Sequence, residues 1–169
     1  LFEGCEGAGA ELGHEVIRMD GAPCSCGRRG CFEAYASASA LVRQTKDAMT
    51  CHPESKMWEL CRGNADHADG RTAFDGMRRG DDTAKEVVER YLNYLAEGIA
   101  NIVNVFRPQA VLIGGGISAE GEALTLSLQK IVDTKILGHG RYAPVTIRTA
   151  SLGNDAGLVG AAMLAKEIK

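Results

Sequence analysis

A group of three cysteines and a histidine constrains the fold of the first thirty residues more than any other feature of the sequence. His14, Cys24, Cys26 and Cys31 form the pattern H-x9-C-x-C-x4-C. Three thiolates and an imidazole are a ligand set typical of tetrahedral zinc, which is soft enough to prefer sulfur. Four protein ligands leave no position for a reacting water, so the pattern predicts a structural Zn²⁺ ion. A chance cluster of reduced thiols is the alternative interpretation.

The other three cysteines, Cys5, Cys51 and Cys61, stand apart from this group. An even number of cysteines is compatible with disulfides, but no secretory signal peptide opens the sequence, and this favours metal binding in a reducing compartment. We therefore expect a cytoplasmic protein in which these three are free thiols, buried or half-buried.

Two carboxylates flank the predicted metal loop. Glu11 lies three residues before His14, and Glu33 lies two residues after Cys31. A metal that gathers both ends of the loop would bring these carboxylates together, and each offers two oxygens to a pair of sugar hydroxyls. The metal would take one ring nitrogen of His14 and leave the other to point outward. From the residues alone, a sugar site and two solvated surface charges remain equally acceptable interpretations.

Composition excludes several classes of protein. The chain has 169 residues, 45% hydrophobic and 24% charged, which suits one soluble domain with a core that needs no disulfides. Its net charge of −3 argues against binding nucleic acid through this chain. The longest apolar runs are too short to span a membrane.

Hydrophobic spacing predicts an α/β arrangement in the second half of the chain. The expected order is a long amphipathic helix over 82–106, a buried strand over 110–113, a glycine loop, a helix over 118–132, a strand over 145–147 and a final helix over 155–166. The first half is expected to contain a short strand over 14–20, a helix over 32–49 and short helices over 55–62 and 72–79.

Three consecutive glycines, Gly114, Gly115 and Gly116, separate the predicted strand from the following helix. Backbone N–H groups in such a turn, with a helix behind them, favour phosphate. The segment matches neither the Walker pattern nor the dinucleotide fingerprint. Contact with a nucleotide and a plain strand-to-helix connection therefore both remain open.

Several of these segments together resemble a known family. The residues are Glu11-Leu-Gly-His14, then Cys24-Ser-Cys-Gly-Arg-Arg-Gly-Cys31-Phe-Glu33, the triple glycine and Gly153-Asn-Asp-Ala-Gly157. They closely resemble the signature of the ROK family (repressor, open reading frame, kinase), which contains bacterial glucokinases, other hexose kinases and sugar-responsive repressors. The resemblance covers essentially the whole chain.

The resemblance implies roles for the residues of this signature. It implies that His14, Cys24, Cys26 and Cys31 hold zinc, that Glu11, His14 and Glu33 contact sugar hydroxyls, and that the loop Gly114–Gly116 lies near ATP. It also implies the larger C-terminal lobe of an actin-like (ribonuclease-H-like) ATPase fold, a homodimer, and ATP with Mg²⁺ as cofactors. Residues 1–150 would form the sugar- and zinc-binding lobe, and residues 151–169 a helix that packs on a smaller N-terminal lobe. Leu158, Val159 and Met163 of this helix would then form an apolar patch.

The family's phosphate loop, Asp-x-Gly-Gly-Thr, does not occur in this sequence, and the Asn154-Asp155 pair of this chain lacks the context of the family's Asn-Asp pair that supplies the catalytic base. We therefore predict the C-terminal portion of an ATP-dependent hexose kinase with glucose as acceptor, inactive alone and without a catalytic residue of its own. The alternative is the sugar-sensing domain of a ROK repressor.

Overall fold

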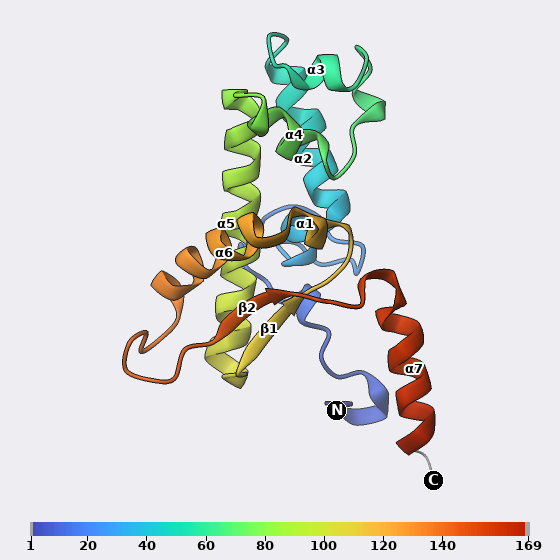
Figure 1. Ribbon diagram of the computed structural model, residues 1–169, viewed down its shortest axis with the longest axis vertical. Coiled ribbons are helices and arrows are strands. Elements are labelled where there is room, and N and C mark those ends of the chain that lie inside the picture. Colours follow the sequence, from blue (N-terminus) through green and yellow to red (C-terminus); the bar gives the residue numbers. More distant parts are fainter. Residues whose placement is uncertain (1, 168–169) are drawn as a thin grey trace.

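The computed structural model describes residues 2–167 and is organised around one long helix, α5 (Asp82–Phe106) (Figure 1). The helix begins at the predicted residue, because the Asp81 carboxylate accepts the Ala84 N–H at 3.1 Å and caps it. It ends where Arg107 adopts a left-handed conformation (φ 44°) before Pro108. Its buried side recurs at spacings of three and four residues, as predicted, and packs against α1, α2, α4 and α6.

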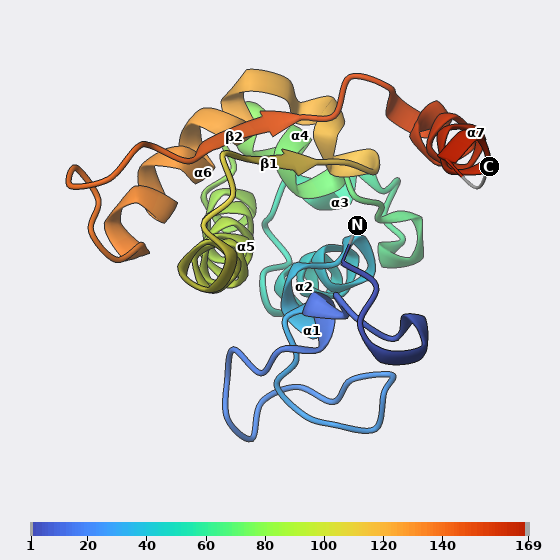
Figure 2. The same ribbon diagram turned by 90° about the horizontal axis from the view of Figure 1, so that it is seen from below.

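The remaining helices and the two strands follow in chain order. They are α1 (Glu33–Ala36), α2 (Ala38–Cys51), α3 (Met57–Leu60), α4 (Thr72–Arg78), β1 (Ala110–Ile113), α6 (Gly121–Lys135), β2 (Thr146–Thr149) and α7 (Ala156–Glu167). In Figure 2, β1 and β2 lie on one side of α5, and α1 and α2 lie on another. The predicted α/β arrangement of the second half is therefore present.

The single helix expected over 32–49 is wrong, because it is divided into α1 and α2 at Ser37. The Ser37 backbone is extended (ψ 164°), and its hydroxyl accepts the Ala40 N–H at 3.1 Å. A serine with extended backbone at this position ends one helix and caps the next. The break separates the short helix that carries Glu33 from the longer one behind it.

The sheet in the described residues consists of β1 and β2, which run parallel with Ala110 opposite Thr146. The outer edge of β2 is covered by Gln129 of α6. The Gln129 amide donates to the Val145 carbonyl at 3.0 Å and accepts the Ile147 N–H at 2.9 Å. One side chain thus replaces the hydrogen bonds of a neighbouring strand. The strand predicted over 145–147 is observed at Thr146–Thr149.

The helix predicted over 118–132 begins later in the structure, at Gly121. Residues Gly116–Glu120 form a 3-10 helix instead, between Gly115 (φ 74°) and Gly121 (φ 63°). Both glycines adopt the left-handed region that other residues avoid. The glycine-rich segment therefore makes one tight turn before α6 begins.

Helix α7 stands away from the rest of the chain (Figures 1 and 2). Leu158, Val159 and Met163 are exposed by 77%, 39% and 57%, so these apolar side chains of the helix are open to solvent. The last two residues of the segment 151–169 lie outside the described residues. Its packing on another lobe remains a prediction.

Across residues 2–167, none of the helices combines the length and the apolar character that crossing a bilayer requires.

Candidate functional site

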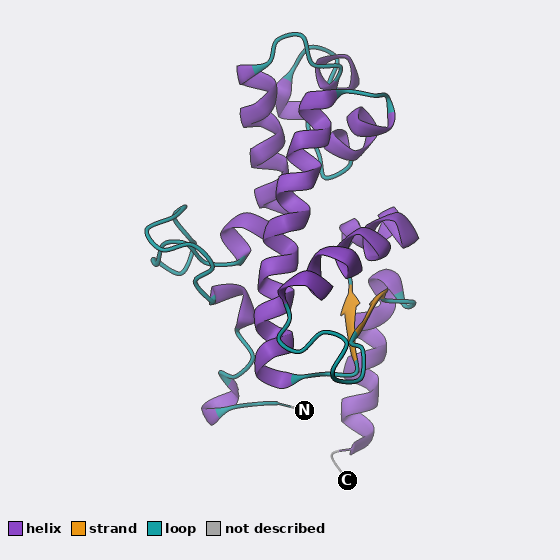
Figure 3. Cartoon of the chain, turned by 90° about the vertical axis from the view of Figure 1, so that its left-hand side faces the viewer, coloured by secondary structure: helices purple, strands orange, loops and turns teal. Residues whose placement is uncertain are grey.

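The predicted metal loop, residues 14–31, projects from the helices (Figure 3). The strand expected over 14–20 is wrong: Leu12–His14 is a 3-10 turn, and the two arms are joined by the isolated bridges of Val16 with Cys31 and of Pro23 with Arg29 instead of by a continuous ladder. The reason is Gly30, whose φ of 82° turns the chain. A Cβ at Gly30 would lie 1.8 Å from the Arg18 carbonyl oxygen, so the arms approach too closely for a regular ladder.

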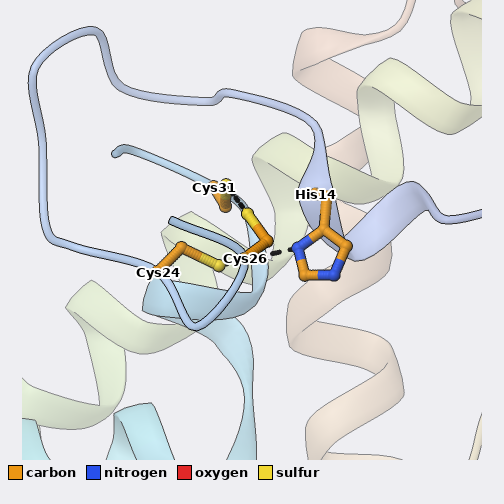
Figure 4. A group of neighbouring side chains, drawn as sticks. All are labelled: His14, Cys24, Cys26 and Cys31. Atoms are coloured by element: carbon orange, nitrogen blue, oxygen red, sulfur yellow. Dashed lines mark hydrogen bonds between the residues drawn. The ribbon is translucent and has the colours of Figure 1, made fainter. Parts of the chain in front are cut away.

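The four predicted metal ligands come together at the base of this loop (Figure 4). Their ligand atoms all lie within 4.8 Å of one another. The Cys26 and Cys31 sulfurs are 3.7 Å apart, and Cys24 Sγ lies 3.5 Å from His14 Nδ1. Cys31 is buried, Cys26 is exposed, and the other two are half-buried.

These separations fit a tetrahedral zinc ion. Bond lengths of about 2.3 Å to sulfur and about 2.0 Å to nitrogen place two sulfurs about 3.8 Å apart and a sulfur about 3.5 Å from a nitrogen. The observed distances of 3.7 and 3.5 Å lie close to both values. The donor set and its spacing therefore suit Zn²⁺.

The local electrostatics favour the thiolate form of Cys24. The backbone N–H of Cys26 lowers the pKa of Cys24 to about 6, and His14 acts in the same direction. Burial raises the pKa of Cys31 to about 11, and the neighbouring thiols add to this effect. A cation among these sulfurs would favour the deprotonated form of each. Nearby, the exposed Arg28 donates to the His14 carbonyl at 3.1 Å and adds positive charge.

The other side of the His14 ring faces one of the two predicted carboxylates. His14 Nε2 lies 3.9 Å from Glu33 Oε2, and both groups are partly open to solvent. Gly13 lies against the Glu33 side chain, and a Cβ at this position would be in ordinary contact, at 3.5 Å, with the same carboxylate oxygen. The structure thus brings Glu33 beside the predicted metal ligands and leaves its carboxylate accessible.

Glu11 is placed next to this pair through the backbone. It precedes the turn Leu12–His14, and its carbonyl accepts the His14 N–H at 3.0 Å. Its own side chain is exposed. The turn therefore places Glu11 and His14 on one short segment.

The last of the three glycines borders a cavity of about 230 Å³. Its walls come from distant parts of the sequence: Gly116, Ile117 and Glu120 on one side, Asp69, Gly70 and Arg71 on another, and Ala38, Leu41 and Tyr91 from the helices. Gly114 and Gly115 precede this wall and are exposed.

The segment 69–71 and Glu120, which line this cavity, were not predicted from the sequence. The segment 69–71 carries no motif, although the Asp69 carboxylate shapes it by accepting the N–H groups of Arg71 and Thr72 at 2.9 and 3.1 Å. Glu120 is held by Arg78 of α4 at 2.6 Å. Their proximity to the glycine turn depends on tertiary packing, so only the Asx turn at Asp69 left a local signal.

The cysteines outside the metal group are free, as expected, but their burial is not as expected. Cys61 is buried, and burial raises its pKa. Cys5 and Cys51 are exposed. The expectation of burial was wrong for these two because Cys5 lies in an exposed 3-10 turn and Cys51 ends α2.

Comparison with known proteins gives consistent matches along the chain. The family model described as "ROK family" matches residues 1–168. A glucokinase of Thermotoga maritima is 40% identical over 169 residues, which cover 99% of this chain and 52% of the relative. An N-acetylmannosamine kinase of Haemophilus influenzae is 33% identical, with 99% and 49% covered.

Solved structures give the same result for the fold. A ROK family glucokinase from Streptomyces griseus, in complex with glucose and AMPPNP, superposes with a TM-score of 0.85 and 35% identity over 95% of this chain and 52% of that one. A ROK family transcriptional regulator, a homologue of the Escherichia coli MLC protein, gives 0.78 and 26% over 98% and 40%. The chain spans about half the length of the relatives it matches. The family match and these relatives place the chain in the ROK family.

Proposed function

We propose that this chain is the C-terminal portion of an ATP-dependent hexose kinase, with glucose as the acceptor. The observation that carries the proposal is the position of the His14 ring, with Nδ1 3.5 Å from the Cys24 sulfur and Nε2 3.9 Å from the Glu33 carboxylate. One ring nitrogen is thereby committed to the metal group, and the other is left with a carboxylate beside it.

This arrangement suits the hydroxyls of a sugar ring. With Nδ1 bound to a metal, Nε2 carries the proton and donates outward, while the Glu33 carboxylate accepts. A donor and an acceptor side by side match a pair of vicinal hydroxyls, each of which can donate and accept. Glu11, exposed on the same turn as His14, supplies a second carboxylate for the ring.

The cavity beside Gly116 is the proposed place for the nucleotide. Its apolar helical wall, which includes Leu41 and Tyr91, suits a base, and its polar rim includes Asp69 and Glu120. Gly114 and Gly115 present backbone without side chains on the way to this cavity. We place the catalytic base and the phosphate and Mg²⁺ contacts in sequence outside this chain.

The proposed metal has a structural role. When bound by His14, Cys24, Cys26 and Cys31, zinc would tie the two ends of the loop and fix the His14 tautomer. The contribution of this chain's own residues is then to position the acceptor. His14 and Glu33 orient the acceptor so that its reacting hydroxyl faces the nucleotide, and such positioning is a large part of phosphoryl-transfer catalysis.

A second candidate is the sugar-sensing domain of a repressor, which the similarity to a ROK transcriptional regulator favours. In that case the sugar site would be used and the nucleotide cavity would not. Homodimers, which the family resemblance implies, are compatible with either function and form part of the proposal.

The test joins this chain to its native upstream sequence and measures ADP release with ATP, Mg²⁺ and a panel of hexoses. Turnover on glucose is the expected result. Sugar binding without turnover on any hexose would favour the sensor, and neither binding nor turnover would overturn the sugar site.

A matched pair of variants assigns the sugar site to this chain. Glu33→Gln removes a charged acceptor, so we expect the KM for the hexose to rise roughly tenfold or more. Glu59→Gln, the same change at an exposed residue of α3, should leave the KM unchanged. Equal kinetics for both variants would contradict the role of Glu33.

A further inference from the structure

The metal loop rests on a buried tyrosine that no motif singles out. Tyr35 lies on α1, is 7% exposed, and packs its ring on Tyr94 of α5 with 4.5 Å between ring centroids. Its hydroxyl oxygen accepts the backbone N–H of Ala22 at 2.6 Å. The hydrogen bond therefore connects the loop to the helical core.

Two further contacts converge on the same point of the loop. The Ala22 carbonyl accepts the Gly30 N–H at 2.8 Å, which joins the two arms. A Cβ at Gly21 would lie 2.0 Å from the Tyr35 hydroxyl, so only glycine permits this approach. The glycine and the hydrogen bond are independent signs that the loop is built around this hydroxyl.

Ala22 and Gly30 form the neck of the loop. Ala22 lies two residues before Cys24, and Gly30 lies immediately before Cys31. Fixing the neck places a metal ligand on each arm near its final position. Less conformational freedom then remains to be lost when the ligands gather around an ion.

We propose that Tyr35 is a positioning residue for the metal loop, whose hydroxyl holds the neck in the conformation that binds zinc. The inference rests on the proposed zinc site. Tyr35 shares the four-residue helix α1 with Glu33, whose carboxylate lies 3.9 Å from His14 Nε2. The same hydrogen bond therefore links the metal ligands to the helix that carries the proposed sugar contact.

Two matched variants test the role of this hydroxyl. Tyr35→Phe keeps the ring and its stacking and leaves the Ala22 N–H without an acceptor. Tyr94→Phe is the control, because the one hydrogen-bond contact of the Tyr94 hydroxyl among residues 2–167 is a long, exposed one of 3.4 Å from Arg18. Competition with a chromogenic chelator, on the complete protein, gives the zinc dissociation constant and the rate of zinc release.

We expect Tyr35→Phe to weaken zinc binding roughly five- to tenfold, as for one lost hydrogen bond, and Tyr94→Phe to change it less than about twofold. Melting with and without zinc separates positioning from general stability. The Tyr35→Phe variant should lose more melting temperature, relative to the wild type, with zinc bound than without zinc.

A second variant keeps the proposal testable if Tyr35→Phe folds poorly. Gly21→Ala leaves the tyrosine intact but pushes the loop from the hydroxyl, so it should also accelerate zinc release. Equal zinc affinity in wild type and Tyr35→Phe, or an equal loss of melting temperature with and without zinc, would overturn the positioning role. A wild-type protein that binds no zinc would overturn the metal site itself, and this inference with it.

Discussion

Gly98, in the middle of α5, sets the distance between that helix and the residue that links the metal group to Glu33. A Cβ at Gly98 would lie 2.4 Å from two ring atoms of Phe32 and 2.5 Å from a third. Phe32 stands between Cys31 and Glu33 in the sequence. Replacing Gly98 by alanine therefore displaces the segment that carries a proposed metal ligand and a proposed sugar contact.

Two opposing effects decide the outcome of Gly98→Ala. Alanine is better than glycine inside a helix by about 0.8–1.0 kcal/mol. Against this, the Phe32 ring must retreat by about 1 Å to restore ordinary carbon–carbon contact, and overpacking of this kind costs about 1–3 kcal/mol. The Phe32 backbone resists such a shift, because its N–H donates to Glu15 at 2.7 Å and its carbonyl accepts from Ala36 at 2.9 Å. We expect the steric cost to prevail, with a net loss of about 1 kcal/mol.

Denaturant unfolding of the zinc-loaded protein measures this balance, and chelator competition on the same samples measures zinc affinity. Both should fall in Gly98→Ala. Gly160→Ala is the matched control: it makes the same change in α7, where a Cβ would meet nothing within 4 Å, so it should be neutral or stabilising by up to about 1 kcal/mol. A Gly98→Ala protein as stable as the wild type would refute the steric argument.

Three further substitutions test the metal group, the α5 cap and the sheet edge. Cys26→Ser should reduce both the amount of bound zinc and the stability. The expected loss of stability is about 2.7 kcal/mol where the zinc concentration is a hundredfold above its dissociation constant. Cys51→Ser is the control and should change neither quantity in assays of metal content and melting. Burial raises the pKa of the Asp81 carboxyl, but hydrogen bonds, above all the one from Ser55, bring this pKa below its usual value. The stabilising effect of the Asp81 carboxylate is therefore complete above the unfolded pKa of about 4, and it is lost as the pH falls through the lower folded pKa. Asp81→Ala should cost about 1 kcal/mol at neutral pH and flatten the acid limb of stability against pH, and an unchanged acid limb would count against this. Gln129→Leu, which leaves an N–H and a carbonyl of the β2 edge unpaired, should cost about 1–3 kcal/mol and speed amide exchange in β2, and unaltered exchange would contradict it.

The parts of the fold that were predictable from sequence are those encoded within one segment. The span of α5 follows from its apolar spacing, the Asp81 cap and the proline that ends it, and the span of β1 follows from four consecutive apolar residues. The expectation that this strand is buried was wrong for Ala110 and Leu112, which are exposed, and right for Ile113. The proximity of the proposed metal ligands belongs to the same class, since His14, Cys24, Cys26 and Cys31 fall within 18 residues and their residue types suit zinc.

The errors occurred where a contact with another segment decides the local conformation. Residues 14–20 alternate as a strand should, yet the close approach of Gly30 to the Arg18 carbonyl leaves room for a single bridge. The split at Ser37 could have been anticipated, because serine before a helical run is a capping signal, but the continuous apolar spacing on both sides concealed it.

Tyr35 shows why a motif identifies ligands more readily than the residues that position them. A zinc ligand must be a thiolate, an imidazole or a carboxylate, so its chemistry restricts the residue type and makes the pattern visible in one sequence. The group that holds the loop needs only an acceptor at the correct place, and a serine, an amide or a backbone carbonyl would serve equally well elsewhere. Its assignment depends on the 2.6 Å contact with Ala22 and on the absence of a side chain at Gly21, both of which arise only when α1 packs beneath the loop. Positioning residues of this kind are therefore determined by the tertiary structure and not by a sequence motif. Removing the Tyr35 hydroxyl tests this distinction, because it leaves every residue of the metal motif in place.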